Sequence, residues 1–153
     1  MSQRERGFTF LELLAVVSII GMMSSLVIPK VFYSLAQQQL RAFADELMND
    51  MRYLQQQAIA DGKSYEIRFY QHTNPPRYLI YQGATQMVRK DLPQGVIYTA
   101  SSFTLTNPVP TLRLNTNGTP SSGGAIEFTN KHNKKVRVIA TPVTARVRIE
   151  EPK

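Results

Sequence analysis

The chain has 153 residues, 42% of them hydrophobic, which is the length and composition of about one folded domain. It contains no cysteine, which excludes disulfides, thiolate nucleophiles and cysteine-based metal sites. Its net charge of +7 is unevenly distributed. Residues 1–61 carry five Lys and Arg against six Asp and Glu, whereas residues 62–153 carry thirteen against five. The second part of the chain is therefore the basic part.

Residues 8–28 form a stretch in which Glu12 is the only ionisable side chain. A helix of this length would be roughly 32 Å long at about 1.5 Å per residue, which matches a hydrocarbon core of about 30 Å. A cleaved secretory signal is the alternative, but its apolar region would be shorter and would end in an A-x-A-like site. The sequence thus predicts a transmembrane helix over residues 8–29, with residues 8–28 in the membrane.

A second helical pattern covers residues 30–61. Apolar residues recur there at spacings of three and four: Leu40, Phe43, Leu47, Met51, Leu54 and Ala58. If Pro29 only kinks the helix, helix extends from about Phe8 to Ala60, and Asp61-Gly62 is the expected stop. A soluble coiled coil is the alternative for this second half. The short apolar stripe favours docking on the chain's own sheet.

The hydrophobic period changes to two after Gly62, which indicates strands. Six segments show it: residues 64–71, 77–83, 111–115, 124–130, 134–140 and 145–151. Turn compositions such as NGTPSSGG and NKHN separate them. The predicted fold class is therefore α+β, with an antiparallel β-sheet head over residues 62–153 that the amphipathic helix covers.

The stretch RGFTFLELLAVVSIIGMMSSLVIPK resembles the processing and assembly segment of type IV pilin-like proteins, the pseudopilins. In that family a short basic leader ends in glycine, the first mature residue is usually Phe, the fifth is Glu, and a proline follows near the end of the membrane segment. Here these positions are Gly7, Phe8, Glu12 and Pro29. The resemblance implies a type IV pilin-like fold.

The resemblance also implies processing by a prepilin peptidase. The enzyme would remove a leader peptide, residues 1–7, by cutting between Gly7 and Phe8, and the new α-amino group of Phe8 is usually methylated in the family. Arg4 and Arg6 favour a cytoplasmic leader by the positive-inside bias. This orientation implies a single-pass protein of the cell membrane with its head outside the cell. In the assembled pseudopilus the head would lie at the cell surface.

Glu12 needs a compensating partner if it lies in lipid. An unpaired carboxylate at the bilayer centre costs on the order of 3 kcal/mol, and Glu12 lies nearer the interface, where the cost is smaller. The resemblance implies that its partner is the Phe8 amine of a neighbouring pseudopilin, an ion pair that would set the register between subunits. The alternative is a glutamate that reaches the interface with its own side chain.

Two later stretches, QQQAIADGKSYEIRF and LRLNTNGTPSSGGAIEF, resemble the D subunit of the Gram-positive competence pseudopilus. They are also similar to H-type pseudopilins of type II secretion and to FimT-like minor pilins. Those relatives often have a Gly-Arg turn where this chain has Thr144-Ala145-Arg146. The resemblance implies a filament subunit for DNA uptake in transformation, with a secretion pseudopilin or a minor type IV pilin as the alternatives.

A membrane-anchored enzyme or receptor is the other class of function. His72 and His132 are isolated in polar, turn-like stretches, and no HExxH, Walker or GxSxG pattern occurs. We therefore expect no catalytic residue, cofactor or metal. The serines and glycines of residues 121–124 are interpreted as a flexible turn, because no helix follows them to make an anion site.

The basic residues of the head are candidates for DNA contact. Six of them would lie on adjacent strands and turns: Lys131, Lys134, Lys135, Arg137, Arg146 and Arg148. Such a face could bind DNA weakly and without sequence preference through its phosphates, or it could serve solubility alone. Five tyrosines could stack on bases or pack in the core: Tyr65, Tyr70, Tyr78, Tyr81 and Tyr98.

Overall fold

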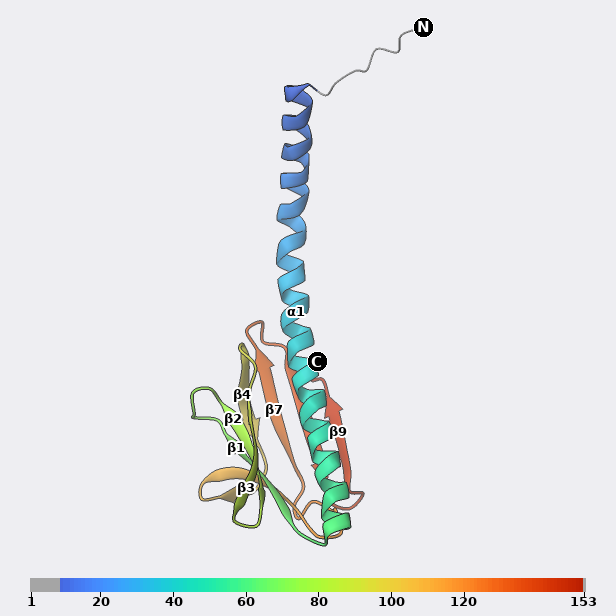
Figure 1. The fold of residues 1–153 in the computed structure, drawn as a ribbon, viewed down its shortest axis with the longest axis vertical. Coiled ribbons are helices and arrows are strands. Elements are labelled where there is room, and N and C mark those ends of the chain that lie inside the picture. Colours follow the sequence, from blue (N-terminus) through green and yellow to red (C-terminus); the bar gives the residue numbers. More distant parts are fainter. Residues whose placement is uncertain (1–8, 153) are drawn as a thin grey trace. The chain divides into compact units, whose positions relative to one another are not determined.

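The computed structural model describes residues 9–152, apart from the side chains of residues 25–29. The chain divides into two compact units, Met1–Leu35 and Ala36–Lys153. Helix α1 (Phe10–Asp61) is drawn as one coiled ribbon in Figure 1 and belongs to both units. Its range includes the backbone of Pro29. The predicted long helix is thus confirmed from Phe10 onward.

The apolar stripe of α1 is buried in the core of the second unit, as predicted. None of its six members, from Leu40 to Ala58, is more than 4% exposed. The helix ends where Gly62 adopts a φ of 63°, a left-handed conformation that glycine accepts without steric cost.

Nine strands follow in two antiparallel sheets. The five-stranded sheet has the order β3-β2-β1-β6-β5 and consists of β1 (Tyr65–Tyr70), β2 (Arg77–Gln82), β3 (Thr85–Asp91), β5 (Leu105–Thr106) and β6 (Val109–Leu114). The four-stranded sheet has the order β4-β7-β8-β9 and consists of β4 (Val96–Ser101), β7 (Gly124–Asn130), β8 (Lys135–Thr141) and β9 (Arg146–Glu150).

All six predicted strands are present, within one or two residues at their ends. The sequence pattern had indicated one sheet, whereas the structure has two, and strands β3, β4 and β5 were not predicted. In β3 every residue except Lys90 is exposed, so the strand lacks the alternation that marks a half-buried strand.

Both sheets and α1 enclose a single hydrophobic core. Phe43 of the helix packs edge-on against Phe128 of β7, with ring centroids 5.1 Å apart. Phe69 of β1 stacks on Phe103, at 5.8 Å between centroids. A Cβ on Gly124 would lie 2.4 Å from the Phe103 ring, so only glycine lets β7 approach that ring. Phe69 of β1 also packs against Tyr98 of β4, with ring centroids 6.2 Å apart, so aromatic side chains join the two sheets.

Gln55 of α1 holds two loops against the helix. Its Nε2 donates hydrogen bonds to the carbonyl oxygens of Gly118, at 3.1 Å, and Ala145, at 2.9 Å. Gly118 has a φ of 75°, and a Cβ there would lie 2.8 Å from the Gln55 carbonyl oxygen. Ala145 has a φ of 49°. Ala145 is therefore strained, because a side chain disfavours this conformation.

Replacing Ala145 with glycine should stabilise the protein. The change removes backbone strain of about 1–2 kcal/mol, and the greater freedom of glycine in the unfolded chain offsets part of that gain. We expect the free energy of unfolding to rise by about 0.5–1 kcal/mol in urea titrations. Ala125→Gly, in strand β7 where φ is not positive, is the control and should lower stability. A destabilised Ala145→Gly variant would contradict the strain assigned to this turn.

Candidate functional site

The first turn of α1 contains Glu12. The Thr9 hydroxyl accepts a hydrogen bond from the Glu12 backbone N–H at 3.2 Å, and the Thr9 carbonyl accepts one from Leu13 at 3.2 Å, so Thr9 caps the helix. This cap was not predicted, although a Thr-x-x-Glu sequence before an apolar run is a capping-box pattern that could have revealed it. The Glu12 side chain is exposed and forms no ion pair with any residue in the described range.

The helix beyond Glu12 presents apolar side chains on all sides. Ten large hydrophobic residues between Phe10 and Met23 are between 45% and 78% exposed. The hydroxyls of Ser18 and Ser24 donate to the carbonyl oxygens of Leu14 and Ile20, both at 2.8 Å, so neither hydroxyl is left without a partner. Apolar exposure on this scale marks a surface that another molecule or a lipid phase covers.

Within the described residues, no helical stretch combines the length and hydropathy needed to cross a membrane. The predicted span over residues 8–28 includes Phe8 and the side chains of residues 25–28, which lie outside the described part. Gly7, the predicted cleavage residue, and the side chain of Pro29 also lie outside it.

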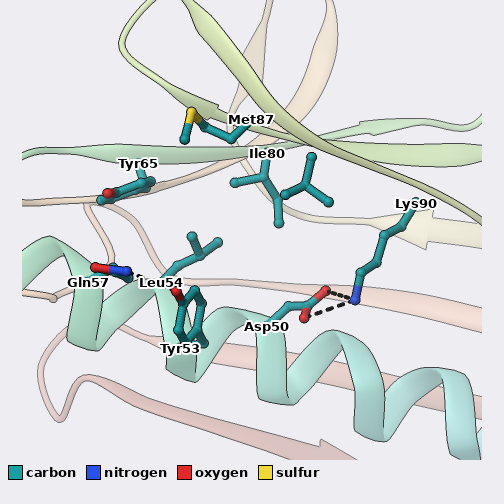
Figure 2. A pocket seen from close by; sticks show the side chains of 9 residues that line it. Asp50, Tyr53, Leu54, Gln57, Tyr65, Ile80, Met87 and Lys90 are labelled. Atoms are coloured by element: carbon teal, nitrogen blue, oxygen red, sulfur yellow. Dashed lines mark hydrogen bonds and ion pairs between the residues drawn. The ribbon is translucent and has the colours of Figure 1, made fainter.

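A pocket of about 220 Å³ lies between α1 and the edge of the five-stranded sheet (Figure 2). Its walls are mainly apolar, and the lining residues are Asp50, Tyr53, Leu54, Gln57, Tyr65, Ile80, Met87, Val88 and Lys90. No serine, histidine or cysteine lines it. The pocket could hold an apolar group.

One end of this pocket is closed by charged and polar contacts (Figure 2). The Lys90 ammonium lies 2.8 Å from Asp50 Oδ2 and 2.8 Å from Glu46 Oε1. Burial lowers the pKa of Lys90, but the hydrogen bonds to Asp50 and Glu46 outweigh burial and leave the pKa above its ordinary value. The Tyr78 hydroxyl donates to Asp50 at 2.6 Å. Lys90 thus connects the edge strand β3 to the helix, and Tyr78 connects strand β2 to it. The Asp50 carboxylate takes part in both connections.

The structure places the six predicted basic residues on one end and one face of the four-stranded sheet. Lys131 and Lys134 lie in the turn between β7 and β8, and the other four lie on β8 and β9. The register pairs Ile139 with Arg148 and Thr141 with Arg146, so the two arginines share the outward face with Arg137. We call these six residues the basic face.

Glu127 of β7 neutralises part of the basic face. Its carboxylate accepts from Arg137 Nη2 at 2.9 Å and lies 3.0 Å from Lys135 Nζ, while its side chain is only 8% exposed. Four other members form no ion pair within the described part of the chain: Lys131, Lys134, Arg146 and Arg148. The role of Glu127 was not predicted from the sequence, because the strand register sets its partners.

The two histidines are not brought together. His72 lies in the turn between β1 and β2, and His132 lies in the turn between β7 and β8. Among the described residues, no group of three His, Asp or Glu side chains is placed to hold a metal ion.

The chain matches one family and one motif of known proteins. The family described as "Type II transport protein GspH" matches residues 44–148, and the "Prokaryotic N-terminal methylation motif" matches residues 2–28. No curated protein matches the chain significantly.

Solved structures with a similar fold come from two bacteria. The minor pseudopilin EpsH of the type 2 secretion system of Vibrio cholerae has a TM-score of 0.58 at 17% identity, covering 74% of this chain and 98% of EpsH. The type IV minor pilin FimU of Pseudomonas aeruginosa has a TM-score of 0.59 at 15% identity, covering 76% of this chain and 95% of FimU.

A helix packed on antiparallel sheets is the type IV pilin-like fold that these solved structures share. The methylation motif covers residues 2–28, which include the first part of α1. The family match covers more than half of the chain, and the chain belongs to the GspH family of type II transport proteins. Pseudopilins and pilins are structural subunits, not catalysts. The predicted fold class is confirmed.

Removing the Glu127 charge should lower stability in a pH-dependent way. Hydrogen bonds from Arg137 and then Lys135 hold the pKa of Glu127 below its ordinary value of 4.5. The carboxylate therefore contributes its full stability above that ordinary value, and the contribution is lost as the pH falls through the lowered pKa.

We expect Glu127→Gln to lower the free energy of unfolding at neutral pH, because it removes the charge that pairs with Lys135 and Arg137. The decrease should be only about 1–2 kcal/mol, because both of these partners are partly solvated. The difference from wild type should shrink as the solution is acidified below the lowered pKa. Glu150→Gln is the matched control, because Glu150 is exposed opposite Arg137 and should have a smaller effect. Chemical denaturation across a pH series measures both. Equal effects of the two variants would argue against the buried pairing.

Proposed function

We propose that the chain is a minor pseudopilin of a DNA-uptake pseudopilus, anchored in the cell membrane by residues 8–28 with its head outside the cell. The observation that carries the filament role is Glu12, a carboxylate without an ion-pair partner in the described chain, among exposed apolar side chains. Membership of the GspH family and the methylation motif support the same role.

Assembly through Glu12 depends on the charge of its carboxylate. A carboxylate surrounded by apolar surface is costly to cover unless a cation accompanies it. The proposed cation is the Phe8 amine of a neighbouring pseudopilin, freed by prepilin peptidase after Gly7 and methylated. Thr9 already caps the helix, and the Glu12 side chain is exposed, so it remains accessible to a partner. Within the membrane, van der Waals packing of the helices would favour association, and the ion pair would fix the register.

The DNA-uptake role is supported by the cations of the basic face that have no acidic partner in the described chain. Lys131, Lys134, Arg146 and Arg148 are exposed. Contacts of this kind bind phosphates weakly, without sequence preference, and lose affinity steeply as salt rises. Lys135 and Arg137 contribute less than their number suggests, because they share the charge of Glu127.

A subunit of a type II secretion pseudopilus is the alternative, and the family description and the likeness to EpsH favour it. A minor type IV pilin is a further candidate through the likeness to FimU. Deletion of the gene distinguishes these roles. Loss of transformation with normal protein secretion supports DNA uptake, whereas loss of secretion with normal transformation supports the type II system.

The first prediction of this proposal concerns processing. In cells with an active prepilin peptidase, membrane fractions should contain a form that begins at Phe8 and lacks the seven residues Met1–Gly7. Mass spectrometry of the intact protein detects the cleavage, and a further mass of one methyl group would show N-methylation. An uncleaved Met1 terminus, in cells where the peptidase processes another substrate, would contradict the pilin-like role.

The second prediction concerns assembly. Glu12→Val removes the charge and its desolvation cost, so the variant should still be cleaved and should stay in the membrane. It should fail to crosslink to other pseudopilins, and transformation should be lost. Glu12→Gln keeps the size and hydrogen-bonding ability of the side chain without its charge, and should weaken the same crosslinks. Normal crosslinks and DNA uptake in Glu12→Val would exclude the ion pair as an assembly contact.

A further inference from the structure

The structure separates the five tyrosines into two groups. Tyr65, Tyr78 and Tyr98 pack in or against the core. Tyr70 and Tyr81 lie on the opposite, outward side of the five-stranded sheet. In β1 the core residues are Tyr65, Ile67 and Phe69, so the alternation of side chains along the strand directs Tyr70 outward. The register pairs Glu66, another outward residue of β1, with Tyr81 of β2, so Tyr81 also faces outward.

Arginines from four strands surround these two tyrosines. The strand register places them on the same outward side. Arg77 lies opposite Tyr70, Arg113 lies opposite Glu66, and Arg89 lies opposite Leu79, which is itself paired with Arg68. The four residues are Arg68 of β1, Arg77 of β2, Arg89 of β3 and Arg113 of β6. We call this set the Arg–Tyr face: Arg68, Tyr70, Arg77, Tyr81, Arg89 and Arg113.

A buried carboxylate holds the centre of the Arg–Tyr face in place. Glu66 is only 7% exposed. One of its oxygens accepts from Arg68 Nε at 3.1 Å and Nη2 at 2.8 Å, and the other accepts from Nε of Arg113 at 2.9 Å and from its Nη2. Burial raises the pKa of Glu66, but these hydrogen bonds outweigh burial and leave it below its ordinary value. The guanidinium planes are therefore pre-oriented by a charge that stays ionised.

The aromatic rings are part of the same array. The Arg68 guanidinium carbon lies 4.2 Å from the centroid of the Tyr81 ring, which is a cation–π contact. The neighbouring Tyr70 hydroxyl, followed by burial, raises the pKa of the Tyr81 hydroxyl. One guanidinium group and one tyrosine ring of the Arg–Tyr face are thus in direct contact.

The charge of the Arg–Tyr face is positive in spite of Glu66. Asp91 pairs with Arg89 at 3.0 Å. The four arginines carry four positive charges and the two carboxylates, Glu66 and Asp91, carry two negative charges, which leaves an excess of two positive charges. Arg77 forms no ion pair with another described residue, although its Nε is buried. The Arg113 side chain is 57% exposed. The surface therefore has charge available for an anionic ligand.

We propose that the Arg–Tyr face binds single-stranded DNA, with bases stacked on the tyrosine and guanidinium planes and phosphates contacted by the arginines. Single-strand binding proteins combine positive charge with aromatic surfaces in this way, because unpaired bases expose their π-faces. A duplex buries those faces and offers chiefly phosphates. The basic face suits a duplex better, because strands β7, β8 and β9 contain no tyrosine.

This inference deepens the proposed contact with DNA by assigning the two strand forms to two separate faces. Arginine and tyrosine are also enriched in protein interfaces, so a neighbouring pseudopilin is the competing occupant. The excess positive charge and the stacked planar groups favour nucleic acid. A protein occupant is an outcome that the experiment distinguishes.

The experiment uses the full-length protein in neutral detergent micelles. Fluorescence anisotropy compares a labelled single-stranded DNA oligonucleotide of mixed sequence with the duplex made from it. We expect wild type to bind the single strand more tightly. The double variant Tyr70→Leu/Tyr81→Leu keeps apolar bulk without π-faces and should lower single-strand affinity about tenfold or more, as loss of base stacking predicts, with duplex affinity unchanged.

Two further variants separate stacking from folding and charge. Tyr70→Phe/Tyr81→Phe retains the aromatic rings and should retain single-strand binding. This variant tests the role of the rings even if the leucine variant does not fold. Arg113→Gln, at an exposed side chain, should reduce the salt dependence of single-strand binding. Thermal unfolding of each variant checks that the fold is kept.

The matched control is Arg146→Gln/Arg148→Gln on the basic face. It should lower duplex affinity and leave the preference for the single strand. If duplex affinity does not change, the proposed role of the basic face fails while the inference about the Arg–Tyr face stands. The inference is overturned if wild type binds both strand forms equally, or if a folded leucine variant keeps its single-strand affinity. It is also overturned if that variant loses only its crosslinks to other pseudopilins.

Discussion

The second unit depends on covering one apolar stripe of α1. Side chains from Leu40 to Ala58 are almost completely removed from solvent, and a Leu or Phe buried in this way contributes about 1.5–3 kcal/mol. Neither sheet covers the stripe alone, because residues of both sheets belong to the same core. The inner faces of the sheets are therefore committed to the helix, and their outward faces remain for contacts with other molecules.

Each outward face is organised around one buried glutamate with two cations. Glu66 is contacted by Arg68 and Arg113, and Glu127 by Lys135 and Arg137. In both cases the carboxylate lowers the net charge of the face while it orders the cations. The count of basic residues therefore overstates how strongly the head attracts polyanions.

Strong periodicity made much of this architecture predictable. The helix from Phe10 and the six alternating strands follow from apolar spacing, and Gly62 marks the end of the helix. Strand β3 could not be recognised because its residues are almost all exposed, and no alternation marks an edge strand of that kind. A single sheet was expected because local patterns do not reveal which strands pair.

The candidate sites were predictable to a different extent. The basic residues could be named from composition, but their sharing of Glu127 depends on the pairing of β7 with β8, which a single sequence does not reveal. Strand pairing likewise decides which tyrosines face the core and which, like Tyr70 and Tyr81, face outward. The cap at Thr9 was visible as a short local motif, because capping involves neighbouring residues only.

The contacts of Gln55 have a consequence for how this fold can diverge. Gln55 holds the Gly118 loop and the Ala145 turn through their carbonyl oxygens, which every amino acid possesses. A substitution at Ala145 that keeps the turn therefore leaves its anchor to the helix intact. One retained donor on the helix would permit wide divergence at residue 145, whereas Gly118 stays restricted, because a Cβ there would lie 2.8 Å from the Gln55 carbonyl oxygen. Subunits with little sequence in common could therefore keep the same arrangement of helix and sheets while the turn at residue 145 acquires different partners.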